Sequence, residues 1–351
     1  MKRILHIIES LEPGGAENLL CNTVSELTEY EHLIVSVFAE PDLSLLPKNA
    51  AYICLNAKHK AEVFLKRGAY KRILRHYKPA LVHAHLYFAT VLAKAFTPSK
   101  IPLLFTQHFE FSKNTSKWYY AFVDKLFSTK KQTCLAVSNA VLQDYVKSTK
   151  FAGQTQVIGI YIPDRYFSLP GPSYAGGQLK MVALGNIKPI KNQRYILEAF
   201  ALLKDLPVLC DVYGDGPHRT EMENEARKKN INVFFKGQIT DSSIVLSNYH
   251  LYIMPSLTEG FPLALFEAMA TGLPPAVSDI PVFHELLGEN ASYLPLEQPN
   301  ALRGFVEHYL NHPQKLVTDG ERAKVIAAAK ASKKGYLQKI RELYTPLPSS
   351  N

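Results

Sequence analysis

The chain has 351 residues, of which 47% are hydrophobic and 20% charged, as in an ordinary soluble protein long enough for two domains. The net charge is +9, and residues 1–163 carry most of it, with 20 Lys and Arg against 12 Asp and Glu, compared with 20 against 19 in residues 164–351. No run of about 18 apolar residues occurs, which excludes a membrane-spanning helix, and the N-terminal apolar run is too short for a signal peptide.

The asymmetry of charge indicates an anionic partner for the first half: a membrane surface, a nucleic acid or a phosphorylated acceptor. The four cysteines, Cys21, Cys54, Cys134 and Cys210, have no C-x-x-C spacing. They are therefore expected to be buried thiols in a reducing compartment.

In the first half, apolar runs and helical patterns alternate. Strands are predicted over residues 4–9, 33–38, 52–55, 81–85, 103–108, 134–138 and 156–160. Helices are predicted over residues 16–28, 61–77, 87–96, 117–127 and 139–147. This alternation predicts a parallel sheet covered on both faces by helices.

Residues 163–177 are rich in Pro, Gly and Ser and form the best candidate for a linker. Beyond them the alternation resumes, with strands over 180–185, 208–213, 233–235, 251–254 and 275–278 and helices over 192–204, 218–229, 242–248 and 262–270. A basic helix is predicted over 322–344. The chain is therefore expected to be α/β, with two doubly wound sheets.

The stretch from Pro255 to Pro274 reads as the end of a buried strand, a loop and a short helix beginning at Pro262. Glu259 lies in the loop, and Glu267 lies in the helix, where its side chain can lean back toward the helix start. Backbone N–H groups at a helix start attract anions. The pattern suits a ligand with both hydroxyls and phosphates, although two glutamates on a generic strand–loop–helix unit need have no function.

The same stretch, EGFPLALFEAMATGLP, resembles the E-x7-E segment of the retaining GT-B glycosyltransferases of family 4. The resemblance implies two Rossmann-like domains facing a cleft: an acceptor-side domain over 1–163, a nucleotide-sugar domain over 164–321, and a C-terminal helix over about 322–346 that packs back onto the first domain. It also implies that Glu267 binds the donor ribose and that Glu259 faces the donor sugar. Backbone groups of the segment from Phe261 through Pro262 to Leu263 would hold the sugar hydroxyls or a phosphate.

Two further segments support the resemblance. Gly14 and Gly15 lie in a Gly-Gly-Ala-Glu turn similar to the family's loop beneath the donor phosphates, although a tight strand–helix turn would look the same. Lys191 matches the lysine that neutralises the donor diphosphate. The family's neighbouring arginine is replaced by Asn186, which removes one charge and a bidentate donor from the expected phosphate site.

Other strand ends complete the expected site. Gly214 lies in a Gly-Asp-Gly-Pro turn similar to one that shapes the family's cleft, and Gln238 and Ile239 match the segment that reads the nucleobase. His108 resembles the active-site histidine that contacts the donor sugar. His83 and His85 share one face of a strand, which could suggest a metal, but no carboxylate or Cys with ligand spacing joins them, and no D-x-D occurs.

The sequence therefore predicts a retaining, metal-independent glycosyltransferase without a cofactor, in which His108, Glu259 and Lys191 are catalytic. Its donor would be a UDP- or GDP-linked sugar, and its acceptor a glycan or a lipid-linked intermediate in cell-surface polysaccharide synthesis. Nucleic-acid binding is not expected. The basic first half, chiefly residues 58–78 and 113–131, favours peripheral contact with an anionic membrane. The protein is therefore expected to be cytoplasmic and to contact the inner face of the membrane. Two alternatives stay open: a weakly active or inactive nucleotide-sugar binder, and a nucleotide-sugar epimerase.

Overall fold

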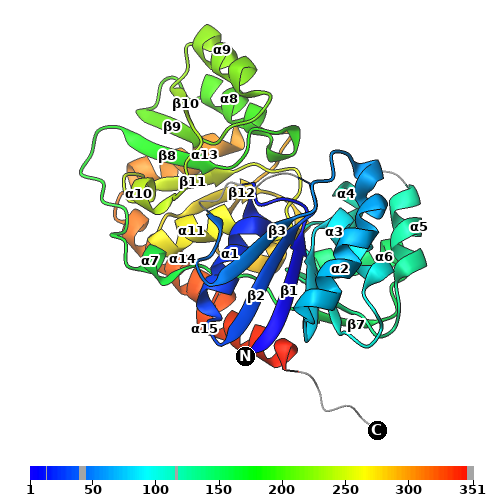
Figure 1. Cartoon of the computed structure of the whole chain (residues 1–351). Helices are drawn as coiled ribbons and strands as arrows, with labels where there is room; N and C mark the ends of the chain where they lie inside the picture. Colours follow the sequence, from blue (N-terminus) through cyan, green and yellow to red (C-terminus); the bar gives the residue numbers. More distant parts are fainter. Residues whose placement is uncertain (13, 39–44, 115–117, 346–351) are drawn as a thin grey trace. The chain divides into compact units, whose positions relative to one another are not determined.

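The computed structural model describes residues 1–12, 14–38, 45–114 and 118–345 (Figure 1). The chain divides into two compact units. Unit 1 comprises Met1–Ile160 together with the C-terminal residues from Lys334, and unit 2 comprises Tyr161–Lys333. The first boundary thus falls three residues before the predicted one, and the second falls twelve residues after residue 321.

Unit 1 contains a seven-stranded sheet in the order β3-β2-β1-β4-β5-β6-β7, and all its pairs are parallel. The predicted parallel sheet is confirmed. The strand order reverses between β1 and β4, which makes this the switch point where ligands bind in such sheets. The strands are β1 Lys2–Ile8, β2 Tyr30–Ser36, β3 Ala50–Cys54, β4 Leu81–His85, β5 Leu103–Gln107, β6 Thr133–Ala136 and β7 Gln154–Val157.

The two faces of this sheet differ in chemistry because neighbouring strand residues point to opposite sides. Leu5 and Ile7 enter an apolar core beneath one layer of helices. His6, between them, lies on the face that also carries His83 of the adjacent strand, and Tyr344 of α15 reaches this second face. The helical elements of unit 1 are α1 Gly15–Glu26, η2 Lys60–Lys66 (3-10), α2 Arg67–Tyr77, α3 Tyr87–Phe96, α4 Phe111–Asn114, α5 Trp118–Phe127, α6 Asn139–Thr149 and α15 Lys333–Tyr344.

The helix predicted over 61–77 is not continuous. Its first part is the 3-10 helix η2, and the α-helix α2 begins at Arg67. Gly68, which is a poor helix former, lies beside this junction. The predicted start of the 117–127 helix, Lys117, lies outside the described residues.

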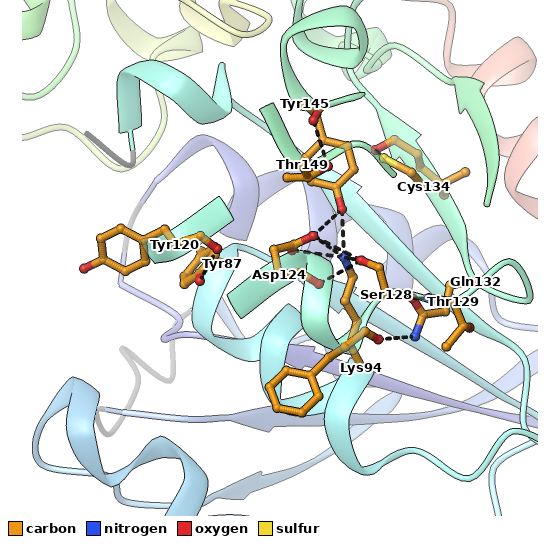
Figure 2. A network of polar contacts seen from close by, with 12 residues as sticks. Tyr87, Lys94, Tyr120, Asp124, Ser128, Thr129, Gln132, Cys134, Tyr145 and Thr149 are labelled. Carbon is orange, nitrogen blue, oxygen red and sulfur yellow. Dashed lines mark hydrogen bonds and ion pairs between the residues drawn. The ribbon is translucent and has the colours of Figure 1, made fainter. Parts of the chain in front are cut away.

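Beneath α3, α5 and α6, the apolar core of unit 1 contains one ion pair (Figure 2). Lys94 and Asp124 are sealed from solvent and lie 2.8 Å apart. The Lys94 ammonium also donates to Ser128 and to the Tyr145 hydroxyl, which in turn donates to Asp124. The ammonium lies 3.9 Å from the centre of the Phe105 ring. A buried charge pair is tolerated when its remaining donors and acceptors are satisfied in this way.

Unit 2 contains a six-stranded parallel sheet in the order β10-β9-β8-β11-β12-β13, as predicted for the second doubly wound sheet. Its strands are β8 Leu179–Leu184, β9 Val208–Tyr213, β10 Val233–Gly237, β11 Leu251–Met254, β12 Pro275–Ser278 and β13 Ser292–Leu294. Its helices are α7 Asp164–Phe167, η3 Pro189–Lys191 (3-10), α8 Gln193–Ala201, α9 Arg219–Lys229, α10 Ser243–Leu246, α11 Leu263–Thr271, α12 Pro281–Leu287, α13 Ala301–Asn311 and α14 Lys315–Lys330.

The single terminal helix predicted over 322–346 is wrong. The chain forms two helices, α14 and α15, with a break at residues 331–332. The first of them belongs to unit 2, where Gly320 lies so close to Gly272 that a Cβ on Gly320 would stand 2.3 Å from the Gly272 carbonyl oxygen. At the break, the Ile162 N–H donates to the Ala331 carbonyl. Close packing of small residues therefore retains α14 in unit 2, and only α15 joins unit 1.

Candidate active site

In unit 2, the strand order reverses between β8 and β11, and ligands in open α/β sheets bind at the carboxyl ends of strands beside such a reversal. A small recess of about 10 Å³ lies there, lined among others by Gly185, Lys191, Gln193, Met254 and Ser256. Residues that follow β8 and residues that follow β11 thus line the same recess. The second group belongs to the stretch from Pro255 to Pro274 that the sequence singled out.

Lys191 and Glu259 form the charged part of this place. Lys191 ends the 3-10 helix η3, and Glu259 lies in the loop between β11 and α11. The Lys191 Nζ lies 2.6 Å from Glu259 Oε1, and the Lys191 side chain stays 27% exposed while that of Glu259 is 5% exposed. The pair therefore presents a cation to solvent over a buried carboxylate.

Gly214 sets how closely two loops of this place approach each other. It has a φ of +148°, and a Cβ at this position would stand 2.0 Å from the Gly185 carbonyl oxygen. Only glycine allows the loops after β8 and β9 to approach so closely. Asn186, on the first of these loops, is exposed, and its backbone carbonyl accepts a hydrogen bond from Gln193 Nε2.

Glu267 projects from α11 toward α10, where Ser242 Oγ donates to Glu267 Oε2 at 2.7 Å. Tyr166 lies 3.0 Å from the same Ser242 hydroxyl. Burial raises the pKa of Glu267, and the hydrogen bond from Ser242 opposes that rise. Sequence reasoning missed Ser242 and Tyr166, because neither belongs to a motif and only the fold brings them to Glu267.

Glu259 and Glu267 share a neighbour. Burial raises the pKa of Tyr252, and the charges of the two glutamates add to that effect. The Tyr252 hydroxyl is buried and has no hydrogen-bond partner among the described residues. Both carboxylates therefore lie close enough to Tyr252 to raise its pKa.

The start of α11 differs from the prediction by one residue. Pro262 is the N-cap, and the helix begins at Leu263 because the backbone of Pro262 (φ −83°, ψ 88°) is not helical. The ring of Phe261 packs 4.7 Å from that of Phe266. The first N–H groups of a helix have no acceptor within it, so those of α11 are suited to bind an anion or hydroxyls.

The residues expected to read the nucleobase follow β10. Gly237, at the end of that strand, has a φ of +84°, and Gln238 is exposed and Ile239 half-buried. These two residues follow the carboxyl end of β10 in the unit 2 sheet.

In unit 1, Gly14 is the N-cap of α1 and Gly15 is its first residue. A Cβ on Gly14 would stand 2.4 Å from Glu17 Oε2. Glu9, which the sequence did not single out, directly follows β1, and its carboxylate accepts a hydrogen bond from the Phe88 N–H at 2.8 Å across the switch point. Burial raises the pKa of Glu9. Next to it, Leu86 has a φ of +64°, a left-handed conformation that costs energy in a residue with a side chain.

His108 follows β5 and is largely buried. Burial lowers the pKa of His108 to about 4, so its imidazole is neutral at pH 7. His108 Nε2 lies 3.4 Å from His85 Nδ1. A neutral imidazole in this position can accept a hydrogen bond from a sugar hydroxyl or donate one to it.

His83 and His85 do share one face, as predicted, and a third histidine joins them. His6 pairs with His83 across β1 and β4, and the three residues place one ring nitrogen each within 4.8 Å of the others, close enough to hold a metal ion. Their pKa values are lowered by burial, which keeps them neutral. His83 already contacts the hydroxyls of Tyr344 and Thr106, whereas His6 Nδ1 and His85 Nε2 have no hydrogen-bond partner among the described residues.

Comparison with known proteins matches both halves of the chain. Residues 13–159 match the family model "Glycosyltransferase Family 4", and residues 172–332 match "Glycosyl transferases group 1". The chain belongs to the family 4 glycosyltransferases. It is a transferase enzyme with the two-domain GT-B fold.

Relatives of this glycosyltransferase include EpsF of Bacillus subtilis, which is 25% identical over 310 residues and covers 79% of each chain. An Escherichia coli protein named UDP-Gal:alpha-D-GlcNAc-diphosphoundecaprenol alpha-1,3-galactosyltransferase is 25% identical over 293 residues, covering 75% of this chain and 71% of its own. Anabaena HepE, solved in complex with UDP and glucose, has the same fold, with a TM-score of 0.85 at 18% identity over 99% of this chain and 100% of its own.

Among the described helices of this glycosyltransferase, none has both the length and the apolar character needed to cross a bilayer.

Proposed function

We propose that this glycosyltransferase moves a sugar from a UDP- or GDP-linked donor to a hydroxyl of a glycan or a lipid-linked acceptor, with retention of anomeric configuration. The observation that carries the proposal is the Lys191–Glu259 pair at the β8/β11 switch point, beside the start of α11. A cation and helix amides suit a leaving diphosphate, whose negative charge grows as the glycosidic bond breaks.

Each candidate residue receives a role in this proposal. Lys191 neutralises the diphosphate, Glu259 supports the donor sugar, and Glu267 holds the ribose hydroxyls. His108 contacts the transferred sugar. The remaining donor contacts are assigned to backbone and polar groups of Gly14, Gly15, Asn186, Gly214, Gln238, Ile239, Phe261, Pro262 and Leu263.

The acceptor class is supported by the relatives. One of them is named for transfer to a diphosphoundecaprenol-linked sugar, and another is named an O-antigen chain mannosyltransferase. A similar acceptor would meet this enzyme at the inner face of a membrane, where the basic charge of the first half favours contact with anionic lipid.

A direct assay tests the reaction. Purified enzyme is incubated with UDP-Gal, UDP-Glc, UDP-GlcNAc or GDP-Man and a water-soluble analogue of a lipid-diphosphate-linked sugar. Release of the nucleoside diphosphate is followed in time, and the product is identified by proton NMR. An α-linked product from an α-linked donor supports the proposal, and a β-linked product contradicts retention. Lys191→Ala serves as the inactive control.

We also propose that the reaction needs no metal, because the Lys191 side chain and the α11 amides supply the positive charge that a diphosphate needs. The expected outcome is full activity in EDTA. Strong inhibition by EDTA that Mg²⁺ or Mn²⁺ reverses would contradict this part alone.

One observation favours a second candidate, a protein that binds a nucleotide sugar with little or no turnover. Asn186 stands where the resemblance places an arginine, so the expected phosphate site has one charge fewer. Calorimetric binding of a donor without release of diphosphate would favour this candidate. A change in the donor sugar without any acceptor would instead indicate an epimerase.

A further inference from the structure

Helix α5 buries its acidic residue and exposes three of its large apolar residues. Its acidic residue, Asp124, is fully buried, while Trp118, Phe122 and Leu126 are 80%, 58% and 63% exposed. These three side chains recur every four residues, so they form one stripe along the helix. Scattered exposed apolar residues are normal in proteins, but a continuous stripe of large ones on a short helix marks a surface that something covers.

The Lys94–Asp124 network explains how the helix is held in this orientation. Figure 2 shows Asp124 pointing into the core toward Lys94, with Tyr145 and Ser128 around the same ammonium group. Because a sealed ion pair is costly to break, it fixes the rotation of α5 about its axis. With Asp124 turned inward, the residues on the opposite side must face solvent.

The surroundings of the stripe are basic. Residues 51–150 contain 17 Lys and Arg against four Asp and Glu, whereas residues 1–50 contain three against eight. Lys125, next to Asp124, is exposed, as are Lys130 and Lys131 just beyond the helix. Exposed lysines therefore lie within a few residues of the apolar side chains in the sequence.

A second element, η2, lies against the end of α5. Phe127 packs 5.7 Å from Phe64 of the 3-10 helix η2. The next residue, Leu65, is exposed, and the basic Arg67 two residues further on is exposed as well. By contrast, α2 buries its own apolar residues Tyr70 and Leu74 in the core and exposes only its basic side. The two basic segments singled out in the sequence thus differ in what they expose. Helix α5 exposes apolar side chains, and α2 exposes basic ones.

We infer that Trp118, Phe122 and Leu126 of α5, together with Leu65 of η2, form a docking surface for an anionic lipid bilayer. Aromatic and aliphatic side chains beside lysines match the boundary between anionic headgroups and acyl chains, where apolar burial and charge attraction act together. A bilayer fits better than a protein partner because the surface combines a high positive charge with apolar side chains but has almost no acidic residues. The inference rests on the proposed function, since a lipid-linked acceptor is found at such a surface.

The chain provides its own probe for this inference. Trp118 is the only tryptophan in the sequence, and it lies on the proposed surface. The enzyme is titrated with vesicles of phosphatidylcholine alone and of phosphatidylcholine with 30% phosphatidylglycerol, and tryptophan emission and co-sedimentation are measured. We expect a blue shift and binding with the anionic vesicles, and quenching by lipids brominated near the glycerol end of the acyl chains.

A matched pair of variants separates the stripe from general apolar exposure. Phe122→Ser combined with Leu126→Ser keeps Trp118 as the probe and should lower the vesicle partition coefficient by at least tenfold. Val325→Ser changes an equally exposed apolar residue on α14, in unit 2, and should leave binding unchanged. Binding of the double variant at wild-type strength would overturn the inference.

Two other results would also overturn it. An emission spectrum unchanged by any vesicle would mean that lipid does not reach Trp118. A blue shift that grows with protein concentration in the absence of vesicles would assign the stripe to a second copy of the chain. Transfer to a water-soluble acceptor is measured in parallel, because the double variant should keep this activity. If the wild type transfers sugar but does not bind lipid, only the docking surface is disproved. If the wild type transfers no sugar, the proposed function is disproved.

Discussion

Two lysine–carboxylate pairs, Lys94–Asp124 in unit 1 and Lys191–Glu259 in unit 2, have similar separations of 2.8 and 2.6 Å but very different surroundings. The first pair is sealed, and hydroxyls of Ser128 and Tyr145 saturate the ammonium group. The second pair leaves about a quarter of the Lys191 side chain exposed. A closed pair can only support structure, while an open one can exchange its partner for an anion.

Burial changes the pKa of the lysine in the first pair. It lowers the pKa of Lys94, and the neighbouring Asp124 opposes that change without cancelling it. Desolvation therefore outweighs the attraction between the charges, as expected in a dry core. Both members of the sealed pair are hidden from water, whereas in the open pair Lys191 keeps contact with water above the buried Glu259.

The largest expected effect comes from breaking the sealed pair. Asp124→Ala leaves the Lys94 ammonium without its counter-charge and should lower the free energy of unfolding by about 3–5 kcal/mol. Urea unfolding followed by circular dichroism measures this change. Lys94→Met combined with Asp124→Leu should recover most of the loss, because the uncompensated charge is gone. A loss below about 1 kcal/mol in Asp124→Ala would show that the pair is not sealed in solution.

The next effect separates activity from stability at the open pair. Lys191→Met should lower kcat about 10²- to 10³-fold, comparable to removing one group that stabilises transition-state charge. Its free energy of unfolding should fall by less than that of Asp124→Ala, because the Lys191 side chain is partly exposed and water can reach the pair. Lys188→Met, at an exposed position on the same loop, is the control. Equal losses of kcat in both variants would contradict the role of Lys191 in stabilising the leaving diphosphate.

A third effect concerns the sealed histidines of unit 1. Because burial lowers the pKa of His108 to about 4, its neutral form stabilises the fold fully above the unfolded value near pH 6.5, and this contribution is lost as the pH falls toward 4. The loss at pH 5 should be about 2 kcal/mol for this residue alone. The difference in unfolding free energy between pH 7 and pH 5, measured in urea, should shrink in His108→Gln. An unchanged difference would mean that His108 titrates normally.

The smallest effect tests the missing charge at the open site. Asn186→Arg restores the cation that the family resemblance places there and should tighten donor binding by up to about tenfold, roughly the strength of one charge-assisted hydrogen bond. Isothermal calorimetry with a nucleotide sugar measures it, and Asn186→Gln controls for size. Tighter binding with unchanged kcat would show that Lys191 alone suffices for turnover. Weaker binding in Asn186→Arg would indicate that this position does not face the diphosphate.

Much of the fold was predictable because buried parallel strands are short apolar runs. The strands Leu81–His85 and Leu251–Met254 and the helix Tyr87–Phe96 have the predicted bounds. The break between α14 and α15 was not predictable, because the pattern of both helices is continuous. At the break, the Ala331 carbonyl accepts a hydrogen bond from the Ile162 N–H, a residue far away in the sequence.

The candidate site divides in the same way. Lys191 and Glu259 were found from local motifs, and the structure brings them together because both follow strands that are neighbours in the sheet. Ser242 has no local signal, and its contact with Glu267 depends on the packing of α10 against α11. His6 joined His83 and His85 only through strand register. The rotation of α5 was likewise hidden, since hydrophobicity alone would place Trp118 inside and Asp124 outside.

The last helix of the chain, α15, completes unit 1 although all of unit 2 precedes it in the sequence. Its Tyr344 hydroxyl lies 2.8 Å from His83 Nδ1. During synthesis, the ribosome produces the β-strands of unit 1 first and the helix that covers their histidine face only after unit 2. The growing chain must therefore keep that polar face open to water while unit 2 folds. A fragment ending near residue 160 would retain this exposed face, so unit 1 is better produced with α15 supplied by a short linker or as a circular permutant.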